Sequence, residues 1–229
     1  MYYAGITELK VLQQLVQKRT AVANQVRGLL CAWGVNLPAR FLARKGSWKE
    51  LAAKRALPGY LPAILQTMLG VYEQLTRAIG ELGTTLELAA RKDRRVERLR
   101  SIPGVGPLSA LTLVSAIDDV KRFPRAKQLT SYCGIVPTVR SSGEREQQGE
   151  ITRQGRSEVR AMWIQAAHSL AQSQRPEARP LQRWFARVVK RRGFRTAIVA
   201  LARKMLSLAF YLLRDGTRFE PLRLGQAAA

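Results

Sequence analysis

The 229-residue sequence contains few acidic residues, two cysteines and one histidine. Cys31 and Cys133 lie far apart and belong to no CxxC or Cys/His spacing, which excludes a disulfide framework and a zinc-type site. The acids are scattered, with Asp118 and Asp119 as a lone pair at a predicted helix end, so no carboxylate cluster for Mg²⁺ is indicated. His168 is expected to be a core or rim residue, and neither a Ser-His-Asp set nor a glycine-rich nucleotide loop is present.

Long hydrophobic runs and targeting signals are also missing. No apolar run approaches the roughly 20 residues of a membrane span, because charged residues interrupt the longest candidates. The first residues, "MYYAGITELK", lack the basic start and apolar core of a secretion signal. An apolar fraction of 46% is ordinary for a globular protein. We therefore expect a cytoplasmic, nucleoid-associated protein without membrane contact.

Positive charge is abundant. Lys and Arg number 39 against 16 Asp and Glu, which leaves a net charge of +23, and 29 of the basic residues are arginine. Such an excess favours a polyanionic partner, most commonly nucleic acid, and the planar guanidinium suits bidentate phosphate contacts. A GC-rich genome is an alternative explanation for arginine over lysine, but it does not explain the shortage of acids.

Apolar periodicity predicts a mainly α-helical fold. Helices are expected at about 7–31 and 48–56, and a long one at 61–98, where Ile64, Met68, Val71 and Leu75 begin a seam with steps of three and four. The first and third would form a helical hairpin or part of an intermolecular coiled coil, and the sequence leaves both open. Further helices are expected at 156–172, 178–192 and 195–214. The predicted domains are a helical module at 1–100, a compact helical domain with one β-hairpin at 101–215, and a tail at 216–229.

The stretch "IPGVGPLSALTLVSAI" at 102–117 has the form of a helix-hairpin-helix loop. Gly104 and Gly106 bracket Val105, and Pro107 stands where a helix begins. Glycines allow the backbone to approach a phosphate, and the N–H groups that open the next helix would face it. The alternative is a tight connection between two helices.

Ten basic residues and one acid, Glu177, lie between Arg175 and Lys204. Arg175, Arg179, Arg183 and Arg187 recur every four residues, so they line one face of the predicted helix. A stripe of one sign suits a phosphate track, whereas an ordinary solvated face normally carries mixed signs.

The segment "VPTVRSSGEREQQGEITRQG" at 136–155 places Ser141 and Ser142 directly before Gly143. Ser-Gly pairs are common turn residues, because glycine adopts positive φ and serine hydrogen-bonds to the nearby backbone. The alternative is that one of these serines is a nucleophile. The arginines around the doublet are compatible with a phosphate partner.

Three stretches together resemble a known family. The segment "LKVLQQLVQKRTAVANQVRGLL" is similar to the N-terminal helix, and "LRSIPGVGPLSALTLVSAIDDVKRFPRAKQLTSYCGIVPTVRSSGE" with "GEITRQGRSEVRAMWIQAA" to the C-terminal domain, of the bridge-RNA-guided insertion-sequence transposases. These enzymes are related to the Piv/MooV site-specific DNA invertases. The similarity covers almost the whole chain and is most specific in its second half.

The resemblance implies the C-terminal part of a recombinase that acts in DNA transposition, with DNA, a structured guide RNA and further copies of itself as partners. It maps the serine nucleophile to Ser142, with Ser141 as the alternative. The family's RuvC-like domain with its DEDD Mg²⁺ cluster is expected to be missing, so this chain would bind no cofactor, and Gln147 stands where the family often has a basic residue. A truncated, inactive nucleic-acid-binding remnant is the alternative function. The nucleic-acid-binding set comprises Gly104, Gly106, Arg140, Arg145, Arg153, Arg160, Arg179, Arg183 and Arg187.

Overall fold

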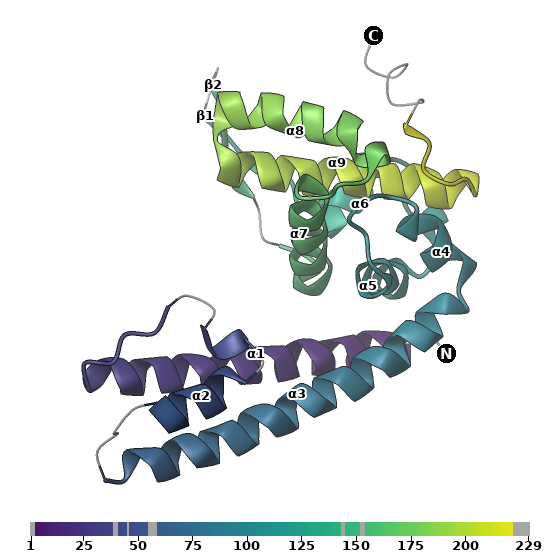
Figure 1. The fold of residues 1–229 in the computed structure, drawn as a ribbon. Helices are drawn as coiled ribbons and strands as arrows, with labels where there is room; N and C mark the ends of the chain where they lie inside the picture. The colour runs from purple at the N-terminus through teal and green to yellow at the C-terminus, as the bar shows by residue number, and fades with distance from the viewer. Residues whose placement is uncertain are drawn as a thin grey trace. The chain divides into compact units, whose positions relative to one another are not determined.

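The computed structural model describes residues 3–38, 41–44, 46–54, 59–142, 145–151 and 154–221, and the fold in these ranges is mainly helical, as predicted (Figure 1). The chain divides into two compact units. One spans Glu8–Thr85, and the other combines Met1–Thr7 with Leu86–Ala229. The predicted boundary near residue 100 lies inside this second unit.

The first unit is built from α1 (Tyr3–Ala32), the 3-10 turn η1 (Phe41–Ala43), α2 (Ser47–Lys54) and the larger part of α3 (Leu61–Arg91). Val26 and Leu30 of α1 pack with Leu61 of α3 in one buried apolar cluster. Trp48 of α2 joins this cluster, and its indole Nε1 donates to the Leu42 carbonyl at 3.0 Å. Burial of these side chains provides the apolar stabilisation that holds the helices together.

The prediction of one helix over 61–98 is wrong at its end. Helix α3 stops at Arg91, and α4 (Arg94–Arg100) begins after Asp93. The Asp93 carboxylate accepts a hydrogen bond from the Arg95 backbone N–H at 2.8 Å, which is a helix N-cap. This cap satisfies an N–H group that a continuous helix would have bonded internally, so the chain starts a new helix here.

The second unit surrounds α9 (Phe194–Asp215), which packs against α4, α6 (Ala126–Tyr132), α7 (Ser157–Ala171) and α8 (Arg179–Arg192). The helices predicted at 156–172, 178–192 and 195–214 are confirmed within two residues at each end. Helix α5 (Pro107–Ile117) packs against α4 and α7, and the indole Nε1 of the fully buried Trp163 donates to the Ser109 carbonyl. The 3-10 turns η2 (Val120–Arg122) and η3 (Pro176–Ala178) complete the set of helical elements in the described ranges.

Helix α9 is long and apolar enough to cross a membrane by length and composition, contrary to the expectation from the sequence. However, 56% of its most apolar window is buried inside the protein. Ala197, Leu201 and Met205 are fully inaccessible at successive turns of this helix. The apolar character of α9 is therefore that of the central core helix of the second unit.

Strands β1 (Pro137–Ser142) and β2 (Arg145–Ile151) form an antiparallel pair between α6 and α7. The register pairs Pro137 with Ile151 and Val139 with Gln148, so β2 contains one extra residue between these pairs. We refer to the two strands as the serine hairpin, because β1 ends with Ser141 and Ser142.

Candidate nucleic-acid interface

The two ends of the serine hairpin meet in a close backbone crossing, which we call the hairpin root. Gly134 has φ +68°, and a Cβ atom there would lie 2.1 Å from the carbonyl oxygen of Gln154. Gly155 has φ +106°, and its Cβ would lie 2.3 Å from the carbonyl oxygen of Tyr132. No side chain fits at either position, and L-residues rarely adopt these dihedrals. Glycine at both positions lets the incoming and outgoing chains touch.

Tyr132 fixes the hairpin root to the helical core. Its hydroxyl donates to the Ala116 carbonyl at 3.1 Å and accepts from the Arg156 guanidinium Nε at 2.9 Å. The backbone N–H of Arg156 donates to the Tyr132 carbonyl, so the first residue before α7 is tied to the last residue of α6. These bonds hold the hairpin at a defined place between the two helices.

Burial continues beneath the hairpin root. Cys133 is fully inaccessible, and this burial raises the pKa of its thiol to about 12, although the nearby Arg160 guanidinium acts in the opposite direction. A Cβ on Gly134 would lie 2.7 Å from Arg160 Nη1, which places this predicted phosphate ligand at the hairpin root. Arg160 is half-buried. The thiol is therefore a packed core group, whereas the adjacent guanidinium reaches the base of the hairpin.

The register of the serine hairpin distinguishes its two serines. Ser142 pairs with Arg145, Ser141 pairs with Glu146, and Arg140 pairs with Gln147. Directly opposed residues have Cα atoms about 4.5–5.5 Å apart, so these are immediate neighbours across the strands. Arg153, another predicted ligand, lies outside the described residues.

The two glycines of the loop between α4 and α5 have different surroundings. Gly104 has φ +84°, and a Cβ there would lie 2.5 Å from the Ala166 carbonyl oxygen and 2.6 Å from the Leu170 nitrogen, both on α7. This glycine is needed for close packing between a loop and a helix. Gly106 is the N-cap of α5, and nothing lies within 4 Å of the position its Cβ would take. The open side of this loop is therefore at Gly106.

The predicted arginine stripe lies along α8. Arg179, Arg183 and Arg187 are exposed, and the first two line an open groove of about 480 Å³ with Gln182 and Ala186. Within the described part of the chain, no ion pair joins these three arginines to an acid. Arg175 precedes η3 and is not on the helix, because Pro176 begins a 3-10 turn. The α8 face therefore carries three cations available to an external anion.

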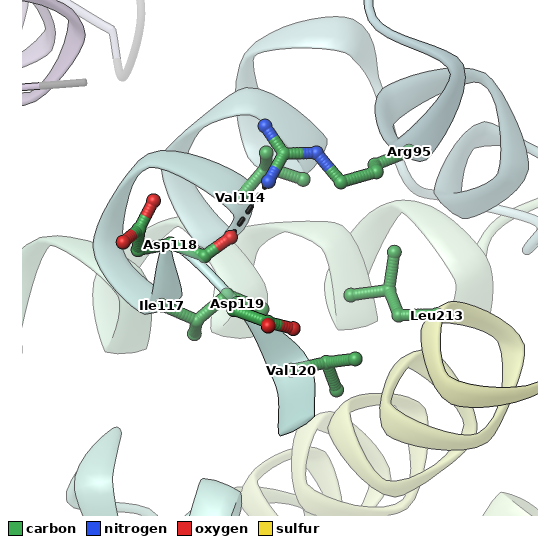
Figure 2. Close-up of a pocket in the computed structure, with 7 residues that line it drawn as sticks. All are labelled: Arg95, Val114, Ile117, Asp118, Asp119, Val120 and Leu213. Carbon is green, nitrogen blue, oxygen red and sulfur yellow. Dashed lines mark hydrogen bonds between the residues drawn. The ribbon is translucent and has the colours of Figure 1, made fainter. Parts of the chain in front are cut away.

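A pocket of about 260 Å³ is lined by Asp118 and Asp119, the two adjacent aspartates noted in the sequence (Figure 2). Arg95 bridges it, since its guanidinium pairs with the Asp93 carboxylate and donates to the Asp118 carbonyl at 2.6 Å. Partial burial opposes ionisation of Asp93, but its bonds with Arg95 outweigh this and lower its pKa. Asp119 caps η2 by accepting from the Lys121 N–H. These interactions join α4 to the end of α5, which is a structural role.

Sequence reasoning missed the hairpin root and an aromatic contact at the start of α9. The roles of Tyr132 and Arg156 depend on partners far away in sequence. Phe194 is 51% exposed, and its ring touches those of His168 and Phe185. The glycine in "RRGFR" at 191–195 was the available signal for a helix break that turns Phe194 outward.

Comparison with known proteins gives consistent matches. Residues 96–182 match the model of the Transposase IS116/IS110/IS902 family. The chain is 32% identical over 220 residues to a transposase for insertion sequence element IS1111A from Coxiella burnetii, which covers 95% of this chain and 59% of that protein. It is 28% identical over 215 residues to a probable family 20 transposase from Pseudomonas aeruginosa, with 93% and 64% covered. A pilin gene-inverting protein from Moraxella bovis is 24% identical over 175 residues, with 75% and 53% covered. The chain thus spans about three-fifths of the length of the first two relatives.

Proposed function

From the similarity of this chain to the IS116/IS110/IS902-family transposases, we propose that it is the DNA-binding C-terminal part of an insertion-sequence transposase and carries the serine nucleophile. The matched segment, residues 96–182, contains the glycine loop, the hairpin root and both serines. It also contains Arg179, the first cation of the α8 face. The proposal therefore unites the features that the structure holds in one compact unit.

The observation that carries the proposal is the register of the serine hairpin. Ser142 is paired with the cationic Arg145, whereas Ser141 is paired with the acidic Glu146. A guanidinium favours the approach of a phosphodiester, and a carboxylate opposes it. We therefore assign Ser142 as the nucleophile and give Ser141 no part in the attack.

The reaction conserves phosphodiester bonds. As the bond between Ser142 Oγ and phosphorus forms, the bond from phosphorus to the departing strand breaks, and the serine proton is ultimately transferred to the oxygen of that strand. The covalent intermediate keeps the bond energy, so resealing needs no ATP. Extra negative charge develops on the phosphoryl oxygens during attack, and we assign its stabilisation to the cations Arg140, Arg145, Arg153 and Arg160.

The described residues do not fit a magnesium site. Among them, no group of three or more His, Cys, Asp or Glu side chains comes together. We derive no step through a metal ion, and the role that we propose for this chain is to bind nucleic acid and to present the serine. A structured guide RNA and further copies of the chain complete the proposed assembly, with the α8 face as a phosphate track.

A covalent-adduct assay tests the nucleophile. The chain would be incubated with labelled duplex DNA carrying the element's ends, together with the N-terminal portion of a related transposase and the element's structured RNA. We expect a protein–DNA adduct that survives denaturing electrophoresis. Ser142→Ala should abolish this adduct, and Ser141→Ala should retain it.

Each outcome of this assay has a distinct meaning. If Ser142→Ala still forms the adduct, the nucleophile assignment is wrong. If the parent chain binds the duplex but never forms an adduct with the other components present, the chain is a nucleic-acid-binding remnant. If it fails to bind the duplex even at low salt, the DNA-binding role itself is wrong.

A further inference from the structure

Phe194 stands exposed at a cationic corner between two helices. Helix α8 ends at Arg192, Gly193 turns the chain with φ +77° and ψ +164°, and Phe194 begins α9 with 51% of its surface exposed. An L-residue at Gly193 would be strained at this φ, so the sharp turn depends on glycine. The turn leaves a large apolar ring facing solvent at the end of the α8 face.

Two neighbouring rings support Phe194 from the protein side. The Phe185 ring of α8 lies 5.8 Å away between centroids at an interplanar angle of 79°, which is an edge contact. The His168 ring of α7 lies 5.8 Å away at an angle of 41°. Aromatic pairs at these separations are favourable. Contacts from two different helices therefore hold the ring in place while about half of the residue remains open.

Four basic residues lie within four positions of Phe194 in the sequence. Lys190, Arg191, Arg192 and Arg195 are all exposed. The sequence between Glu177 and Asp215 contains no acid, so neither α8 nor the part of α9 before its last residue supplies a competing carboxylate. Tyr211 is another exposed aromatic residue of α9, but its surroundings are not uniformly cationic. Arg214 lies over its ring and is already paired with Asp215.

We propose that Phe194 is a stacking platform for an unpaired nucleobase, with the adjacent cations binding the phosphates on either side of that base. Single-stranded nucleic acid is recognised by this combination of an aromatic ring and a positively charged track. A base within a continuous duplex offers no free face, so the site selects single-stranded or frayed nucleic acid. This inference rests on the proposed nucleic-acid binding and names the part of the substrate that it engages.

Binding of three labelled oligonucleotides, measured by fluorescence anisotropy at fixed salt, tests the platform. The probes are single-stranded DNA, single-stranded RNA of the same sequence, and a blunt duplex. Phe194→Ala should weaken single-strand binding by about five- to 150-fold, the range measured for loss of one stacked base, and should leave duplex binding within twofold. Phe194→Leu should weaken it almost as much, because leucine keeps apolar bulk without a flat ring. Tyr211→Ala is the matched control and should bind all three probes as the parent does.

A second measurement protects the test against misfolding. The fluorescence of 2-aminopurine placed in the single strand should be quenched by the parent and not by Phe194→Leu, whose thermal melting reports its folding. If Phe194→Ala and the parent bind the single strands equally, or if duplex binding falls equally, the platform is wrong while nucleic-acid binding stands. If the parent binds none of the probes at low salt, the proposed function fails as well. A preference for the DNA or the RNA strand identifies the source of the base.

Discussion

The hairpin root and the α8 face, both parts of the proposed nucleic-acid site, are built in opposite ways. At the root, Gly134 and Gly155 bring two backbone segments into contact, and a buried thiol lies beneath them. On α8, exposed arginines stand without an acidic partner in the described part of the chain, and nothing packs over them. The close backbone contact at the root fixes the position of the serine hairpin. The exposed arginines of α8 instead attract phosphate groups over a range of positions. A change at the root should therefore cost stability, and a change on the face should cost affinity.

The largest effect is expected from Gly134→Ala. The new Cβ would lie 2.1 Å from the Gln154 carbonyl at a φ that disfavours L-residues, so we expect the free energy of unfolding of the second unit to fall by about 3 kcal/mol or more. Urea denaturation monitored by tryptophan fluorescence measures this. Gly80→Ala, at an open helical position, should instead stabilise by up to about 1 kcal/mol. A neutral Gly134→Ala would show that the root is not closed.

The next effect concerns the open face. Replacing Arg179, Arg183 and Arg187 together by alanine should weaken DNA binding about a hundredfold at low salt, without loss of thermal stability, because all three are exposed. The slope of log affinity against log salt should also fall by nearly three, about 0.9 for each lost phosphate contact. Electrophoretic mobility shifts over a salt series measure both quantities.

The control for the arginine variant is Arg218→Ala. Arg218 is exposed, like the three stripe residues, but it already forms an ion pair with Glu97. Its removal should leave the affinity and the salt slope unchanged. An equal loss in both variants would mean that net charge, rather than the α8 face, attracts DNA.

The buried thiol gives the hairpin root a pH dependence. Unfolded Cys133 ionises above about pH 9, whereas the folded thiol stays protonated up to about pH 12. Between these values, rising pH lowers the free energy of unfolding by at most about 1.4 kcal/mol per unit, and from pH 9, where the unfolded thiol is half ionised, to pH 10.5 the loss is about 1.5 kcal/mol. Urea denaturation at both pH values, compared with Cys133→Ala, isolates this contribution. A difference between parent and variant that does not change with pH would contradict the closed environment of the thiol.

The helices could be predicted from local spacing, whereas the root could not. The three- and four-residue steps of Ile64, Met68 and Val71 suffice for α3, because helix periodicity is a local property. The break at Asp93 depends on one capping hydrogen bond. It could not be predicted because the apolar periodicity of the sequence continues past this residue. Similarly, the four-residue spacing that begins at Arg175 conceals the 3-10 turn at Pro176.

The candidate site depends on what lies opposite each residue. The sequence and its family resemblance singled out the serines, but pairing of Ser142 with Arg145 and Ser141 with Glu146 follows from the strand register. In the same way, the sequence gives no reason to distinguish Gly104 from Gly106, because both flank Val105 in the same loop. Their difference arises because α7, which begins some fifty residues later, packs against one and not the other.

The smallest effect on stability is expected at Asp118, a position with a positive φ outside the hairpin root and the α8 face. Asp118 adopts φ +59° and ψ −76°. A positive φ of this kind strains an L-residue, and at the hairpin root such positions are occupied by glycine. The Asp118 carboxylate is exposed and has no hydrogen bond in the described structure. Asp118→Gly should relieve this strain and raise the free energy of unfolding by about 0.5–1 kcal/mol, since the entropy that glycine adds to the unfolded chain offsets part of the gain. Asp118→Asn removes the same charge but retains the Cβ, so it should stabilise less. Asp119→Gly, which removes the η2 cap, should instead destabilise by about 1 kcal/mol. If Asp118→Gly destabilises in the same urea series, the carboxylate has a role that outweighs its strain, and the pocket beside Arg95 becomes a functional site.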